Sequence, residues 1–309
     1  MQLNKKPEIS VLMPVYNAEK YLAKAVESIL QQTFSNFEFV IFNDGSTDKS
    51  LKILQHYAAQ DSRIRLISRE NKGLVATLNE GISIINTPLI ARMDSDDIAL
   101  PDRFAIQKNY MDNHLDVVCV GGGCRVIDGK GRYLVNADIK TGYEIVEKLA
   151  LQGISPICHP SAMIRTEALK QVGGYLPKDY PAEDLALWLR LSEIGKIDNV
   201  PEVVLEYRIH DQSISTSNHK LQMNKLKVIC EEACAKRGIS LPYLATEGRA
   251  VGSRHSRFEI ILKPGWWAFN SREWKTAFIY GLKSTAVLPF RLDGWRLIVC
   301  ALIKRPDKK

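Results

Sequence analysis

The stretch Ile90-Ala-Arg-Met-Asp-Ser-Asp-Asp-Ile-Ala-Leu-Pro-Asp-Arg103 places three carboxylates at the end of a short apolar run. Apolar runs of this length, bounded by turn residues, are typical of buried strands. Asp94, Asp96 and Asp97 would repel one another there, and a hard divalent cation with oxygen ligands would neutralise them. Taken alone, the same residues could also form a solvated acidic turn before a helix that starts near Pro101. The surrounding motifs decide between these two interpretations.

The first two hundred residues alternate predicted strands and helices. Short apolar runs predict strands at residues 9–13, 37–42, 64–68 and 89–93. Apolar residues at helical spacing predict helices at residues 19–32, after residue 48 up to about 59, and at 74–85. This alternation favours an α/β fold with a mostly parallel sheet that helices cover on both faces.

Polar residues follow each of the four predicted strands. The four segments are Pro14-Val-Tyr-Asn17, Asn43-Asp-Gly-Ser-Thr-Asp48, Asn71-Lys-Gly73 and the Asp94 cluster. Each segment alone has an ordinary explanation, because Asp-Gly and Asn-x-Gly are common in loops. In open parallel sheets, however, ligands bind beyond the carboxyl ends of the strands. The sequence therefore predicts one cleft to which all four loops contribute.

A second group of carboxylates lies later in the chain. Further strands are predicted at residues 117–121, 161–164 and 199–207, and a helix that is apolar on nearly every side begins near Glu183. Glu183 and Asp184 at its start would interact favourably with the helix dipole. The same position would also direct a carboxylate into a cleft.

Charge is distributed unevenly along the 309 residues. Residues 219–309 hold 18 Lys and Arg against 7 Asp and Glu, a net charge of +11, whereas residues 1–218 have a net charge of −4. This asymmetry indicates that the two segments face different partners. The six cysteines form no Cys-x-x-Cys pair and residues 1–8 are polar, so we expect reduced thiols and no secretory leader.

Together these motifs resemble the nucleotide-sugar-dependent glycosyltransferases of family 2, whose fold is called GT-A. The resemblance spans about residues 8–212, and five motifs in order are a specific pattern. It implies a GT-A catalytic domain at residues 1–215, with a nucleotide-binding half at about 1–115 and an acceptor half at about 116–215. The motifs are Val11–Asn17, Phe42–Asp48, Asn71–Gly73 with Asn79 and Gly81, Asp94–Asp96, and Glu183–Asp184 with Trp188 and Arg190.

The resemblance also implies roles for individual residues. Asp96 would bind the Mn²⁺ or Mg²⁺ that bridges the diphosphate, and His210 is either a second metal ligand or a structural histidine. Asp184, beside Glu183, corresponds to the catalytic base. Val15 and Tyr16 would line the nucleobase pocket, and Asp44 would contact the base or ribose. The complete set of implied nucleotide-binding residues is Pro14, Val15, Tyr16, Asn17, Asp44, Lys72, Asp94 and Ser95.

This set of residues suits the chemistry of sugar transfer. Breaking the bond between an anomeric carbon and a nucleoside diphosphate leaves negative charge on phosphate, which a divalent cation offsets. A positioned carboxylate accepts the proton of the incoming hydroxyl, a contribution of about 10²–10⁴ in rate. One base and one displacement imply inversion at the anomeric carbon. The family further implies a UDP-sugar donor, transfer of a hexosyl or N-acetylhexosaminyl group, and a role in a bacterial surface glycan.

The predicted helical region at residues 216–309 combines tryptophans with basic residues, as in Phe290-Arg-Leu-Asp-Gly-Trp-Arg296. Its longest apolar run is shorter than the roughly 20 residues that span a bilayer. We expect a helix in the membrane interface, and hence a cytoplasmic enzyme at the inner face of the cell membrane with a glycan or lipid-linked acceptor. Alternatively, the aromatic residues pack on the catalytic core. Nucleic-acid binding is disfavoured because no recognition motif accompanies the charge.

The residues fit three other functions less well. A catalytically inactive nucleotide-binding or scaffold protein of the same fold is disfavoured by the presence of both Asp96 and Asp184. A processive synthase is disfavoured because Trp188-Leu-Arg190 does not reproduce the Q-x-x-R-W motif. A nucleotidyltransferase is disfavoured because Pro14-Val-Tyr-Asn17 stands where a glycine-rich basic loop is expected.

Overall fold

The computed structural model describes residues 6–210, 219–245 and 254–304. Parts of the sequence predictions lie outside the described residues, namely the polar residues 1–5, the predicted domain boundary at residues 215 and 216, and residues 246–253 and 305–309 of the basic region. The chain forms two compact units, which are described separately. The sheet unit comprises residues 1–124, 138–207 and 221–245, and the helical unit comprises residues 125–137, 208–220 and 246–309.

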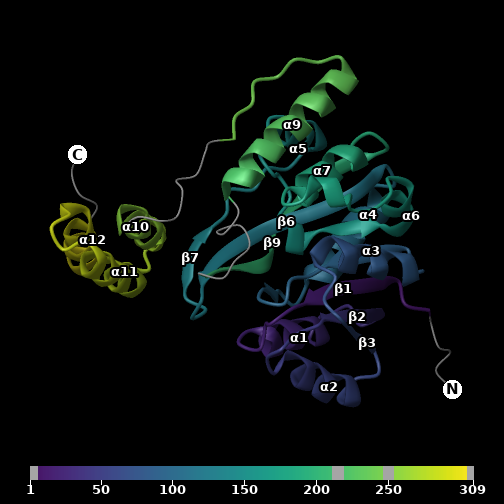
Figure 1. Ribbon diagram of the computed structural model, residues 1–309, viewed down its shortest axis with the longest axis horizontal. Coiled ribbons are helices and arrows are strands. Elements are labelled where there is room, and N and C mark those ends of the chain that lie inside the picture. Colours follow the sequence, from purple (N-terminus) through teal and green to yellow (C-terminus); the bar gives the residue numbers. More distant parts are fainter. Residues whose placement is uncertain (1–5, 211–218, 246–253, 305–309) are drawn as a thin grey trace. The chain divides into compact units, whose positions relative to one another are not determined.

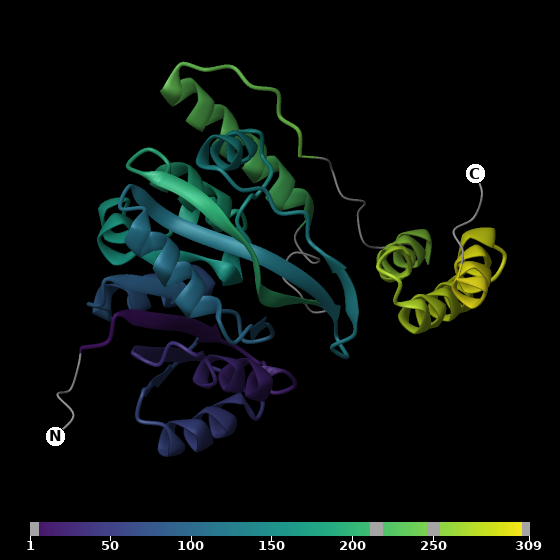
Figure 2. The same ribbon diagram turned by 180° about the vertical axis from the view of Figure 1, so that it is seen from behind.

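Among the described residues, nine strands join in one sheet, in the order β3-β2-β1-β4-β8-β6-β9-β5, with β7 paired to β6. The long strands β6 and β9 are neighbours, as Figure 2 also shows. The strands are β1 Ile9–Val15, β2 Phe37–Asp44, β3 Ile64–Arg69, β4 Leu89–Arg92, β5 Ile98–Ala99, β6 Val117–Asp128, β7 Tyr133–Asn136, β8 Met163–Arg165 and β9 Lys196–Ile209.

The strands β1 to β4, which belong to the α/β repeats, pair in parallel. In β1, Ile9 lies opposite Phe37 of β2 and Leu89 of β4, and β2 pairs in parallel with β3. The pairings of β8 with β4 and with β6 are antiparallel, as is the pairing of β5 with β9. The predicted α/β class is confirmed, and the carboxyl ends of β1 to β4 reach the same edge of the sheet.

Helices cover both faces of the sheet, because alternate residues of each strand point to opposite sides. Val11 and Met13 belong to one core cluster with residues of α1, α2 and α4, whereas Leu12 belongs to a second cluster with residues of α3, α5, α7 and α9; Figure 1 labels these helices. The helices of the sheet unit are α1 Leu22–Leu30, α2 Ser50–Gln60, α3 Leu74–Ile84, α4 Arg103–Asn113, α5 Tyr143–Leu151, α6 Thr166–Gln171, α7 Glu183–Leu191 and α9 His219–Arg237.

The helical unit contains α10 (Arg254–Asn270), α11 (Trp274–Val287) and α12 (Leu292–Ile303). Its core includes side chains from all three helices and Leu134 of β7, which is fully buried. This confirms that the C-terminal region is helical. Within the described residues, no helix combines the length and the apolar character that crossing a membrane requires.

Candidate active site

The loops that follow β1 and β2 are joined by hydrogen bonds between side chains and backbone. Asn17, which has a φ of 49°, accepts a bond from the backbone N–H of Thr47 at 2.8 Å and donates its own N–H to Ser46 Oγ at 3.0 Å. Asp48 accepts bonds from the N–H groups of Glu19 and Ser50, at 3.0 and 2.9 Å. These hydrogen bonds therefore hold the two loops together at the carboxyl edge of the sheet.

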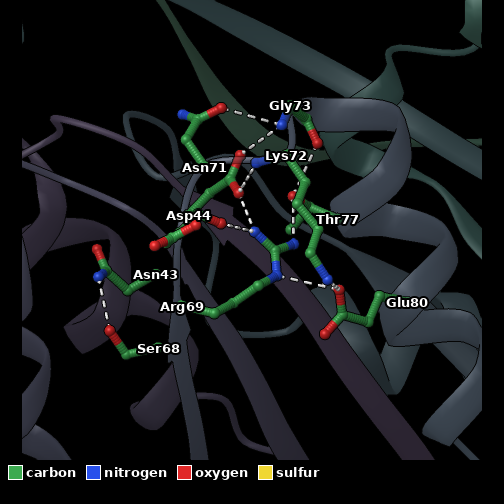
Figure 3. A network of polar contacts seen from close by, with 10 residues as sticks. Asn43, Asp44, Ser68, Arg69, Asn71, Lys72, Gly73, Thr77 and Glu80 are labelled. Carbon is green, nitrogen blue, oxygen red and sulfur yellow. Dashed lines mark hydrogen bonds and ion pairs between the residues drawn. The ribbon is translucent and has the colours of Figure 1, made fainter.

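Asp44, the last residue of β2, connects these two loops to the loop after β3 (Figure 3). Its carboxylate accepts the N–H groups of Lys72 at 2.8 Å and Gly73 at 3.0 Å, and forms an ion pair with Arg69. Burial alone would raise the pKa of Asp44, but the bonds from Lys72 and Arg69 outweigh it and lower that pKa. Asp44 therefore remains a carboxylate and holds the Lys72–Gly73 segment in place.

Asp94, Asp96 and Asp97 gather directly after β4. One carboxylate oxygen from each lies within 4.8 Å of the others, an arrangement that suits a hard cation with oxygen ligands. Asp94 also forms an ion pair with Arg92, whose side chain is nearly fully buried. The charge of Asp94 outweighs the effect of burial and raises the pKa of Arg92. Arg92 thus neutralises part of the negative charge that we expected a metal cation to neutralise.

Asp184 lies in the first turn of α7 and shares the electrostatic environment of this cluster. Burial raises the pKa of Asp94, and the charges of Asp96 and Asp184 raise it further against the effect of Arg92. Burial likewise raises the pKa of Asp184, which accepts the N–H of Leu185 at 2.7 Å. A carboxylate with a raised pKa, close to a cation site, is suited to accept a proton.

Glu183 differs from Asp184 in its surroundings. It is only 7% exposed, and its Oε2 atom receives no hydrogen bond from the residues that the structure describes. Burial, followed by the charge of Asp184, raises the pKa of Glu183 to about 7. Both adjacent acids therefore have raised pKa values, and the half-buried Asp184 is the more accessible of the two to a substrate.

A neutral histidine lies near Arg92. The Nε2 atom of His159 is 2.7 Å from the hydroxyl of Tyr175, and the His159 ring meets the indole of Trp188 edge to face. Burial and then the charge of Arg92 lower the pKa of His159 well below its usual range. His159 therefore packs as an uncharged ring beneath the site.

The structure places the remaining predicted residues as follows. Pro14 and Val15 are buried within β1, and Val15 is only 1% exposed in the apolar core. Tyr16 is 54% exposed, so its ring is available to a ligand. The Lys72 side chain forms an ion pair with Glu80 at 3.2 Å. Ser95 lies half-buried between Asp94 and Asp96.

His210 follows β9 directly, is half-buried, and belongs to the helical unit. Its predicted role as a metal ligand therefore stays a prediction. The same holds for the nucleotide-binding residues and for Asp184 as the base.

Sequence reasoning missed Arg69, Arg92 and Tyr175. A signal for Arg92 was present, because a lone cation in the apolar strand Leu89-Ile-Ala-Arg92 is costly to bury without a partner. Arg69 carried a similar signal at the end of β3, where it pairs with both Asp44 and Glu80. Tyr175 carried none, since nothing in its neighbourhood indicates its contact with His159.

Comparison with solved structures identifies the fold. The chain superimposes on S. aureus TarS 1-349 in complex with UDP-GlcNAc with a TM-score of 0.60 at 16% identity, covering 96% of this chain and 88% of that one. It also matches the mannosyltransferase PcManGT from Pyrobaculum calidifontis, solved with GDP-Man and Mn²⁺, with a TM-score of 0.55 at 16% identity, covering 97% and 81%. These likenesses place the chain among proteins with the GT-A fold.

Sequence comparison supplies the family. Residues 10–173 match the model of glycosyl transferase family 2. The chain is 35% identical over 213 residues to the O-antigen biosynthesis glycosyltransferase WbnJ of Escherichia coli, which covers 68% of this chain and 82% of that protein. The protein therefore belongs to glycosyl transferase family 2, and it is a glycosyltransferase.

Proposed function

We propose that the protein catalyses metal-dependent, inverting transfer of a sugar from a nucleotide-sugar, expected to be a UDP-sugar, to a glycan or lipid-linked acceptor. The observation that carries this proposal is the arrangement of Asp184 with the acidic cluster, in which its charge raises the pKa of Asp94. A proton acceptor and a cation site within electrostatic reach of each other are the two parts that such a reaction needs.

The residues after β4 fit a divalent cation by their chemistry. Asp94, Asp96 and Asp97 each offer one oxygen, and Mn²⁺ and Mg²⁺ prefer such ligands. When bound, the cation supplies Lewis-acid stabilisation of the leaving diphosphate. The structure of the P. calidifontis mannosyltransferase with Mn²⁺ supports this assignment for our chain. We assign Asp96 as the principal ligand.

Asp184 serves as the base in this proposal. Its Oδ1 atom is held by the N–H of Leu185 at 2.7 Å, and its Oδ2 atom lies 3.4 Å from the hydroxyl of Ser155. These contacts orient the carboxylate while leaving it partly exposed. Asp184 takes the proton from the acceptor hydroxyl as that oxygen attacks the anomeric carbon, so a single displacement inverts the configuration.

The nucleotide is assigned to the joined loops at the edge of the sheet. The exposed ring of Tyr16 and the Lys72–Gly73 segment held by Asp44 are the proposed contacts. The UDP-GlcNAc complex of S. aureus TarS supports a uridine nucleotide. The name of the E. coli relative supports a role in surface polysaccharide biosynthesis, which implies a cytoplasmic enzyme that works at the inner face of the membrane.

Calorimetric titration tests the donor and the metal together. UDP and GDP are titrated into the full chain with and without Mn²⁺, and we expect metal-dependent binding of UDP. Asp96→Ala should remove the metal dependence, whereas Asp112→Ala, which alters a largely exposed carboxylate on α4, should not. UDP binding that depends neither on Mn²⁺ nor on the Asp96→Ala substitution would contradict the metal assignment.

A second variant separates catalysis from binding. Asp184→Asn removes the base but keeps the shape of the side chain, so we expect UDP binding to persist while transfer falls by about 10²–10⁴. An inactive scaffold protein would instead show no transfer in the wild type under conditions where UDP binds. Unchanged turnover in Asp184→Asn would assign the base to another residue.

A further inference from the structure

Helix α12 is apolar on nearly every side. One side is buried in the core of the helical unit, where Leu297, Cys300 and Ala301 are each at most 4% exposed. The other side carries large apolar residues that are 49–73% exposed. We call this set the exposed stripe: Leu292, Trp295, Val299, Leu302 and Ile303. A helix on the surface of a soluble domain ordinarily presents polar residues there.

The spacing of these residues makes the stripe continuous. Leu292, Trp295, Val299 and Leu302 follow one another at intervals of three and four residues, which places their side chains on one face of a helix. Phe290, 96% exposed, stands just before the helix begins. Single exposed apolar residues need no explanation, but a contiguous row of this kind marks a surface that binds something apolar.

The surroundings of the stripe are basic. Residues 254–304 hold nine Lys and Arg against three Asp and Glu, a net charge of +6. Arg296 of α12 and Lys304, which directly follows the helix, are both exposed. Asp293, the one acidic residue in the sequence of α12, is paired with Arg291 at 2.8 Å. A partner for this surface must therefore offer apolar groups together with negative charge.

We propose that the exposed stripe of α12 inserts into the surface of a bilayer that contains anionic phospholipids. The twelve residues of α12 are too few to span such a bilayer, so the helix lies in its plane with the stripe toward the acyl chains. The basic side chains then face the lipid headgroups. This inference goes beyond the proposed reaction and does not depend on which sugar is transferred.

A second copy of this chain is a poorer occupant. Two helical units that brought their stripes together would also bring together two surfaces of the same positive charge, and like charges close together repel. The anionic bilayer satisfies both the apolar and the charged part of the surface at once. It also accounts for Trp295, because tryptophan is enriched at membrane interfaces.

Vesicle co-sedimentation of the full chain tests the stripe. Vesicles of phosphatidylcholine with phosphatidylglycerol are compared with vesicles of phosphatidylcholine alone, and the wild type should bind the anionic vesicles more strongly. Trp295→Ser combined with Leu302→Ser should lower the partition coefficient by at least about tenfold, because two large apolar side chains lose their burial. Neither side chain belongs to the core of the unit, although Trp295 Nε1 donates a hydrogen bond to the carbonyl oxygen of Pro289 at 2.8 Å.

Leu115→Ser is the matched control. Leu115 is 79% exposed but lies in the sheet unit, so its loss removes a similar apolar surface from another part of the chain. The partition coefficient of the Leu115→Ser variant should equal that of the wild type. Arg296→Glu combined with Lys304→Glu should weaken binding to the anionic vesicles and lessen its dependence on salt. Thermal unfolding of each variant confirms that it is folded.

Three results would overturn the inference. One is a wild type that stays in the supernatant with anionic vesicles at low salt. Another is equal partitioning of the wild type and the Trp295/Leu302 double variant. A third is an oligomer in solution that the double variant breaks while neither protein binds vesicles, because a second copy then covers the stripe. UDP binding measured on the same samples shows whether the proposed reaction fails independently.

Discussion

Replacing Asp44 by Asn removes one charge from a buried network, and the structure allows the cost to be worked out. The Asp44 side chain is 5% exposed, and it accepts bonds from the N–H groups of Lys72 and Gly73 as well as from Arg69. Removing one member of a buried ion pair typically costs about 3–5 kcal/mol, because the other charge is left without a partner.

Two features of the site place Asp44→Asn below that range. Arg69 keeps a second carboxylate, Glu80, at 3.0 Å, so its charge is still compensated. The Asn side chain also retains one oxygen that can accept a bond from Lys72 or Gly73. The NH₂ group of the Asn side chain, however, faces the other backbone N–H group and cannot accept a hydrogen bond from it. We therefore expect Asp44→Asn to lower the free energy of unfolding by about 2–3 kcal/mol.

Urea denaturation at several pH values measures this loss. The folded-state pKa of Asp44 is lowered, so its contribution to stability is present above its unfolded value and disappears as pH falls through the folded value. The difference between wild type and Asp44→Asn should thus be full at pH 7 and vanish in acid. Asp116→Asn, which changes an exposed carboxylate paired with Lys196, serves as the control and should leave the midpoint unchanged.

The reasoning fails if Asp44→Asn unfolds at the same urea concentration as the wild type at pH 7. It also fails if the difference between the two proteins does not depend on pH. A loss in Asp116→Asn equal to that in Asp44→Asn would show that the effect comes from net charge and not from the network.

Two further predictions concern Glu183 and Gly45. The pKa of Glu183 is raised to about 7 in the folded protein, so folding should become less favourable as pH rises from the pKa of Glu183 in the unfolded chain through 7. In the presence of a chelator, Glu183→Gln should therefore stabilise the protein at pH 8 by up to about 3 kcal/mol. At pH 4 the same substitution should have no effect. Equal urea midpoints at pH 8 would contradict this. Gly45 has a φ of 71°, and an added Cβ would lie 2.6 Å from the backbone nitrogen of Asn71, so Gly45→Ala should cost about 2–4 kcal/mol. Gly173 has a φ of 77°, and among the described residues no atom lies within 4 Å of an added Cβ, so Gly173→Ala should lose only the smaller stability that the backbone strain accounts for. Equal losses in the two variants would rule out the steric contact at Gly45.

Periodic segments of the sequence were predictable, and segments without a period were not. The apolar run starting at Ile9 and the amphipathic spacing after Glu19 correspond to β1 and α1. The short strand β7 and the helix α6 were missed, because four and six residues are too few to establish a repeat. The predicted strand at residues 117–121 is the start of β6, which continues to Asp128 through Gly121–Gly123. Glycines weaken the strand pattern in the sequence, although β6 continues through them without a break.

The candidate site was predictable where its residues follow strands in sequence. The Asp94–Asp97 group and Asp44 lie at the ends of β4 and β2, so the pattern of strands was enough to bring them to one edge. Buried partners were harder to predict, because Arg92 and Tyr175 depend on contacts between residues far apart in the chain. The motifs identified the acids, but the positive and neutral groups that set their pKa values required the three-dimensional structure.

The path of the chain through the helical unit limits how this region could be exchanged between enzymes. The unit is not a simple C-terminal tail, because residues 125–137 and 208–220 belong to it as well. Leu134 of β7 is fully buried in the same core as Phe258 and Leu297. Cutting the chain after residue 245 would leave Leu134 without those partners. A recombination event, or a designed chimera, must therefore carry residues 125–137, the end of β6 with β7, together with α10 to α12.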